Sequence, residues 1–141
     1  MRHRKKTVKL NRTSSHRRAM LANLVSSLIR EEAITTTRAK ARAARPLAEK
    51  MVTLARAGTL AGRRRAVAIL RDKEAVKKLF DEVASRFSDR PGGYTRILKL
   101  ALPRRGDGAE LVRLSFIDAH GPTAPAKDRK KKKAEPVSEE K

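Results

Sequence analysis

The sequence offers little that could carry out catalysis. Its three histidines are far apart, at His3, His16 and His120, without the spacing of shared metal ligands. The acidic pairs at 31–32 and 81–82 are sequence neighbours, whose side chains point about 100° apart on a helix and do not face each other as a dyad. There is no phosphate-binding loop, nucleophile elbow or cysteine. We therefore predict no enzymatic activity, no metal, no cofactor and no small-molecule substrate.

Basic residues are the chemistry that the chain does offer. Thirty-six Lys and Arg against fifteen Asp and Glu give a formal net charge of +21. Such dense charge favours nucleic acid as the partner, because each neutralised phosphate releases counterions. No stretch approaches the roughly 20 apolar residues of a membrane-spanning helix, and the absence of cysteine suits a reducing cytoplasm. The composition predicts a cytoplasmic nucleic-acid-binding protein without a membrane segment.

The most specific basic region is the N-terminus. Residues 1–12 carry no acid and show no sustained apolar periodicity, which predicts an arm that threads between RNA helices. The "RTSSHRR" that follows combines the amides of a helix start, which bind phosphate, with side chains that hydrogen-bond phosphate, ribose hydroxyls or unpaired bases. The residues predicted here to contact RNA are Arg2, His3, Arg4, Lys5, Lys6, Lys9, Asn11, Arg12, Ser14, Ser15, His16, Arg17 and Arg18.

Later segments add weaker candidates. The "RRR" at 63–65 spans nearly a helical turn, so its members cannot all face a core. In "RPGGYTRI" at 90–97, the glycines permit a turn and close backbone approach, while the only tyrosine of the chain either stacks on an unpaired base or anchors a sheet. The predicted RNA contacts in these segments and nearby are Arg38, Lys40, Arg63, Arg64, Arg90, Gly92, Gly93, Tyr94 and Arg96.

A helix and the strand that follows it must position the N-terminal group of predicted RNA contacts. Thr13, Ser14 and Ser15 are N-cap candidates for a helix with one apolar face. That face consists of Met20, Leu21, Leu24, Val25, Leu28 and Ile29. The β-branched "AITTT" at 33–37 then predicts a strand.

Three further helices are expected before the chain becomes extended. The first is capped by Thr36 or Thr37 and runs to about Arg56, and Pro46 should kink or divide it. The next directs Leu60, Ala66, Val67 and Leu70 inward. The last begins at the N-cap candidate Asp72, and its apolar face consists of Val76, Leu79, Phe80, Val83 and Phe87.

The C-terminal part predicts a hairpin and a tail. "PRRGDG" connects two extended segments, at 94–102 and 109–117. With the strand at 33–37, the hairpin should form a small, mostly antiparallel sheet covered on one face by helices, which is a two-layer α+β fold. We predict a basic arm at 1–12, a globular domain at 13–118 and a charged, flexible tail at 119–141.

Three separated motifs resemble a known family. "MRHRKKTVKLNRTSSHRRAMLANL", "AITTTRAKARAARPLAEKMVTLAR" and "RPGGYTRILKL" are similar, in order and spacing, to the family of protein seventeen of the bacterial large ribosomal subunit. The resemblance covers about residues 1–118 and implies a structural ribosomal protein that binds large-subunit ribosomal RNA and touches neighbouring ribosomal proteins. The alternative is a nonspecific DNA-compacting protein of the nucleoid type.

Overall fold

Helices and strands follow one another in the predicted order. The structure, a computed structural model, describes residues 8–117. Its main elements are α1 (Ser14–Glu31), β1 (Ala33–Thr37), α2 (Arg38–Arg56), α3 (Leu60–Leu70), α4 (Lys73–Lys78), β2 (Thr95–Lys99) and β3 (Leu111–Phe116). A π-helical turn, η1 (Leu79–Val83), and a 3-10 turn, η2 (Ser85–Phe87), lie between α4 and β2. The predicted tail at 119–141 and most of the predicted arm lie outside the described residues.

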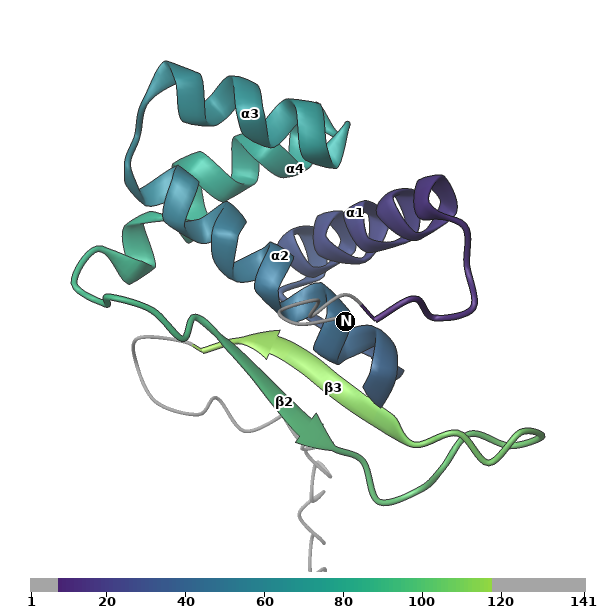
Figure 1. Cartoon of the computed structure of the whole chain (residues 1–141). Coiled ribbons are helices and arrows are strands. Elements are labelled where there is room, and N and C mark those ends of the chain that lie inside the picture. The colour runs from purple at the N-terminus through teal and green to yellow at the C-terminus, as the bar shows by residue number, and fades with distance from the viewer. Residues whose placement is uncertain (1–7, 118–141) are drawn as a thin grey trace, which may run out of the picture.

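The three strands form one antiparallel sheet in the order β1-β3-β2. Thr35 of β1 is the register partner of Arg113, which is in turn the partner of Leu98 in β2. Figure 1 shows α1 and α2 on the same side of this sheet. The α+β architecture predicted from the sequence, with two layers and a small sheet, is therefore confirmed.

The core lies between the helices and the covered face of the sheet. Val25, Leu28 and Ile29 of α1 are fully buried, as the apolar periodicity predicted. Alternate residues of β3 face the same core, and these are Val112, Leu114 and Phe116. The buried face of α2 is rich in alanine, with Ala41, Ala44, Ala48 and Ala55. Small side chains let α2 pack close to its neighbours, so few aromatic residues are needed to fill the core.

Two expectations about the helices were wrong, namely that Pro46 could divide its helix and that Leu60 would point inward. Pro46 does not divide α2, which is continuous from Arg38 to Arg56. Both Pro46 and Arg42 are exposed, so the carbonyl that loses its helical partner can face water. Leu60 does not point inward but is 65% exposed, because the buried face of α3 is set by Gly62, Ala66 and Leu70 at intervals of four. Leu60 lies two residues, about 200°, away from that face.

The predicted fourth helix is interrupted after Lys78. A wider turn follows, in which the Ala84 N–H donates to the Leu79 carbonyl at 3.0 Å, an i to i+5 bond. Leu79, Val83 and Phe87 nevertheless remain buried. The apolar spacing thus identified the buried side chains, whereas the change of helical pitch left no signal in that spacing.

Candidate nucleic-acid interface

The start of α1 is open to solvent. Its N-cap residue, Thr13, makes no capping hydrogen bond with its side chain, and the first turn contains no acidic residue. The first bond of the helix runs from the Arg17 N–H to the Thr13 carbonyl at 2.9 Å. The backbone N–H groups of residues 14–16 therefore have no acceptor within 8–117. They form the positive end of an 18-residue helix, where an anion is stabilised.

Two other helix starts in the described part of the chain, those of α3 and α4, are closed by their own side chains, whereas the N-cap residue of α2, Thr37, makes no side-chain capping bond. The Thr59 hydroxyl accepts from the Gly62 N–H at 3.1 Å at the start of α3. The Asp72 carboxylate accepts from the Ala75 N–H at 3.1 Å at the start of α4, as the sequence predicted. The start of α2 nevertheless differs from that of α1, because its first backbone N–H, that of Arg38, donates to the Glu110 carbonyl at 3.1 Å.

A tight turn brings further basic side chains to the open end of α1. The Arg12 N–H donates to the Lys9 carbonyl at 3.2 Å, and Asn11 has a left-handed φ of 50°. Arg12 Nη1 then lies 2.8 Å from His16 Nε2, and Arg18 Nε donates to the Ser14 carbonyl at 3.4 Å. The exposed residues around this end are Lys9, Asn11, Ser14, Ser15, His16 and Arg18, with Arg12 and Arg17 half-buried.

Ion pairs divide the predicted basic residues into two groups. Arg38 pairs with Glu110 at 2.9 Å and thereby lowers the pKa of that carboxyl below its ordinary value. Arg63 pairs with Asp81 at 3.3 Å, and its guanidinium lies 4.9 Å from the centre of the Phe80 ring. The remaining predicted cations have no acidic partner within residues 8–117, and these are Lys9, Arg12, Arg17, Arg18, Lys40, Arg64, Arg90 and Arg96.

Tyr94 faces the core and not the solvent. Its side chain is 2% exposed, and its ring centre lies 5.2 Å from that of Phe87. Arg56 Nη1 donates to the Tyr94 hydroxyl at 3.1 Å. A base cannot stack on a buried ring, so of the two roles open at the sequence level the structure favours anchoring, and Tyr94 is removed from the predicted RNA contacts.

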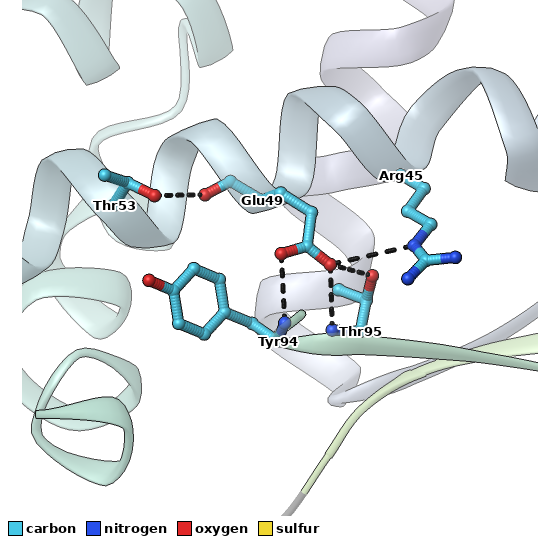
Figure 2. Close-up of polar contacts among 5 residues, drawn as sticks. All are labelled: Arg45, Glu49, Thr53, Tyr94 and Thr95. Atoms are coloured by element: carbon cyan, nitrogen blue, oxygen red, sulfur yellow. Dashed lines mark hydrogen bonds and ion pairs between the residues drawn. The ribbon is translucent and has the colours of Figure 1, made fainter. Parts of the chain in front are cut away.

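A single carboxylate holds this segment against α2. Glu49 Oε2 accepts from the Tyr94 N–H at 2.9 Å, and Glu49 Oε1 accepts from the Thr95 N–H at 3.1 Å and the Thr95 hydroxyl at 2.7 Å (Figure 2). Arg45 lies 3.7 Å from the same carboxylate. Sequence reasoning missed Glu49, although one signal was available, since it is the only acidic residue in α2.

The glycines beside Tyr94 remain accessible. Gly93 has a φ of +68°, which favours glycine, and no heavy atom lies within 4 Å of a Cβ built on either Gly92 or Gly93. A partner can therefore approach this backbone closely. The loop is nevertheless far from the open end of α1, on the opposite side of the molecule in Figure 1. The predicted residues do not form a single cluster, and Arg2, His3, Arg4, Lys5 and Lys6 lie outside the described residues.

Comparison with known proteins identifies the family. The family model described as ribosomal protein L17 matches residues 20–117, which is more than half of the chain. The chain belongs to the ribosomal protein L17 family. Members of this family are structural components of the ribosome. The chain is therefore a structural ribosomal protein and not an enzyme, and the DNA-compacting alternative finds no support.

Curated relatives of the L17 family match nearly the whole chain. Large ribosomal subunit protein bL17 of Bradyrhizobium diazoefficiens is 53% identical over 118 residues, covering 84% of this chain and 85% of the relative. The bL17 protein of Desulforapulum autotrophicum is 54% identical over 117 residues, covering 83% and 97%. That of Allorhizobium ampelinum is 47% identical over 135 residues, covering 96% and 95%.

The described residues contain neither a membrane-spanning helix nor a cluster of metal ligands. No helix within 8–117 is long and apolar enough to cross a membrane. The same residues contain no group of three or more His, Asp or Glu placed to hold a metal ion.

Proposed function

We propose that the chain is held in the large ribosomal subunit by direct binding of ribosomal RNA at the open end of α1. The observation that carries this proposal is the uncapped, acid-free first turn of α1, surrounded by cations that have no acidic partner among the described residues. A phosphate there accepts from the free backbone N–H groups while Arg17 and Arg18 neutralise its charge. Ser15 and His16 reach the neighbouring ribose or base edges.

The folded domain contributes geometry to this binding. α1 is anchored through Val25, Leu28 and Ile29, so its first turn is presented on a rigid support. Binding of RNA then costs little ordering of the helix itself. In the basic arm predicted at 1–12, Arg2, His3, Arg4, Lys5 and Lys6 supply additional phosphate contacts.

Secondary contacts come from the other unpaired cations. Lys40, Arg64, Arg90 and Arg96 have no acidic partner within residues 8–117 to release before they bind phosphate. The open backbone at Gly92 and Gly93 allows a phosphate or ribose to approach Arg90. Arg38 and Arg63 must exchange a carboxylate for a phosphate, so their net contribution is smaller. The proposed location is the cytoplasm, within the large subunit, in contact with neighbouring ribosomal proteins.

Crosslinking in purified large subunits tests the proposal. Mapping of the attached nucleotides and peptides should place ribosomal RNA on the peptide that contains residues 9–18. The peptide around Val83 and Phe87, which are buried, is the internal control and should carry no nucleotide. Crosslinks confined to peptides other than 9–18 contradict the proposed site, and release of the chain from subunits by DNase supports the DNA-binding alternative.

Salt dependence provides an independent measurement. If about six to ten phosphates are neutralised, raising the salt from 50 to 200 mM should weaken binding to isolated ribosomal RNA about a thousandfold or more. Deletion of residues 1–12 should reduce incorporation into subunits while the domain stays folded. An affinity that does not change with salt excludes the electrostatic mechanism.

A further inference from the structure

The sheet has one covered face and one open face. The covered face carries Val112 and Leu114 beneath the helices (Figure 1). Side chains alternate along a strand, so Thr35, Arg113 and Leu98, which are partners across the three strands, lie on the other face. All three are exposed, and no described helix packs on them.

Exposed apolar side chains are concentrated in the hairpin that contains β2 and β3. Five large apolar residues are exposed within 8–117, and three of them lie in the hairpin, where Leu98 is 48%, Leu100 40% and Leu102 77% exposed. The Leu100 N–H donates to the Leu111 carbonyl at 3.0 Å, so β-pairing continues and Leu100 shares the face of Leu98. Leucines grouped at alternate positions on a free sheet face are typical of a protein interface.

RNA does not explain this leucine row. Phosphate and ribose offer little apolar surface for a leucine, and stacking on bases requires aromatic or guanidinium groups. Phe87, Tyr94 and Phe116 are buried in the core and contribute no ring to this face. A partner that removes Leu98 and Leu100 from water must supply apolar side chains of its own.

Charge and area narrow the choice of partner. Arg113 is exposed and has no acidic partner within residues 8–117, whereas the hairpin carboxylates Asp107 and Glu110 are engaged by Arg104 and Arg38. A carboxylate on the partner would complement Arg113. A second copy of the chain is a poor candidate, because its net charge of +21 repels an identical molecule.

The open face is also small for an independent complex. Three strands of five or six residues cover roughly 250 Å² of sheet, whereas a stable interface buries about 800 Å² on each partner. A small face supports a specific contact when both partners are already held on the same scaffold, because their effective concentration is then high. That condition is met by two proteins bound to one ribosomal RNA.

We propose that the open sheet face, with Leu98 and Leu100 along its β2 edge and Arg113 on the central strand, docks an apolar segment of a neighbouring large-subunit protein that presents a carboxylate to Arg113. This inference rests on the proposed function, since the neighbour is brought near by the shared RNA. Arg96, at the other end of β2, stays among the RNA contacts, so the protein interface borders the RNA surface.

Site-specific photocrosslinking in assembled subunits tests this proposal. The variant Leu98→p-benzoylphenylalanine should crosslink to another ribosomal protein in purified large subunits. The matched control is Leu60→p-benzoylphenylalanine, which places the same probe at a leucine that is 65% exposed on α3, away from the sheet. The control should not give the same protein crosslink. Crosslinks from position 98 only to RNA, only to residues 118–141 of the same chain, or to nothing overturn the inference.

Leucine substitutions give a second, independent measurement. The double variant Leu98→Ser and Leu100→Ser should raise the fraction of chain released by a salt wash of large subunits about tenfold, because two buried leucines are lost from the contact. Leu60→Ser should leave release unchanged. Affinity for isolated ribosomal RNA should be the same in all three proteins. Equal release of the double variant and the control overturns the inference. Failure of the unaltered chain to bind isolated ribosomal RNA overturns the proposed function.

Discussion

The start of α1 and the Tyr94–Thr95 pair within the segment at 90–96 belong to two arginine-rich regions but have opposite surroundings. Both combine arginines with small residues, and both were predicted to contact RNA. At the start of α1, Ser14, Ser15 and Arg18 are exposed and the backbone N–H groups are free. In the second region Tyr94 is 2% exposed and Thr95 is equally buried, and both backbone N–H groups are occupied by Glu49.

The difference shows that basic composition alone does not identify a binding surface. What separates the two regions is whether each donor already has an acceptor within the protein. Donors without an acceptor at an exposed helix start gain a partner when a phosphate binds. Donors that are already paired, such as the buried N–H groups of Tyr94 and Thr95, would have to break protein contacts first. Substitutions at Tyr94 and at its partner Glu49 should therefore change stability, and substitutions at the start of α1 should change RNA binding.

The largest effect is expected for Tyr94→Ala. Removing a fully buried ring beside Phe87 should lower the free energy of unfolding by about 4 kcal/mol, as seen for buried aromatic residues in general. Tyr94→Phe, which loses only the hydroxyl bonded to Arg56, should cost about 1 kcal/mol. Urea denaturation followed by circular dichroism measures both. A Tyr94→Ala protein that is as stable as the parent but binds RNA weakly would assign the ring to RNA.

Glu49→Gln should have the next largest effect on stability. The carboxylate accepts from the Tyr94 N–H, the Thr95 N–H and the Thr95 hydroxyl, and an amide replaces one accepting oxygen with a donor. One buried N–H then loses its acceptor, at a cost of about 2 kcal/mol. Glu82→Gln, at an exposed site, is the matched control and should leave the denaturation midpoint unchanged. Equal midpoints for the two variants would show that the Glu49 contacts do not stabilise the fold.

The sequence predicted the elements better than the way they are joined. Apolar spacing located the buried faces of α1 and β3, because burial depends directly on that spacing. Apolar spacing could not predict the strand order β1-β3-β2 or the π-helical turn after Lys78, because both depend on how distant segments pack. Pro46 was misjudged because a local rule about proline says nothing of whether the freed carbonyl meets solvent.

The candidate site was predictable where it depends on local properties of the sequence, and not where it depends on contacts between distant elements. "RTSSHRR" was identified because helix capping and charge are local properties. The role of Tyr94 could not be settled, since its burial depends on Phe87 and Arg56, which come from other elements. Likewise the pairing of Arg38 with Glu110 joins residues 72 positions apart and left no pattern in the sequence.

The double variant Arg17→Ala and Arg18→Ala should affect binding without affecting folding. Both side chains lie within the first five residues of α1, and neither has an acidic partner within the described residues. Loss of two phosphate contacts should weaken RNA binding about tenfold to thirtyfold and make the salt dependence shallower by about two counterions. Filter binding at several salt concentrations measures both quantities. The double variant Arg71→Ala and Arg105→Ala, which removes two charges from exposed arginines without an acidic partner within residues 8–117, is the control for net charge. An equal loss of affinity in that variant would mean that only total charge matters.

The smallest expected effect is on acid stability, at the junction between α1 and β1. The hydrogen bond from Arg86 lowers the pKa of Glu32 below its ordinary value, and Lys78 adds to this at 3.9 Å. Because the folded-state pKa is depressed, the stabilisation is present above the unfolded value of about 4.3 and is lost as pH falls below it. Glu32 is 38% exposed, so screening by solvent limits the contribution to about 0.5 kcal/mol.

Glu32→Gln should therefore be slightly less stable than the parent at pH 7 and should lose less stability between pH 5 and pH 3. Denaturation midpoints across that range measure the difference, with Glu31→Gln, at the exposed neighbouring position, as the control. Parallel pH profiles for the parent and Glu32→Gln would show that this internal ion pair contributes as little to folding as the unpaired cations at the start of α1.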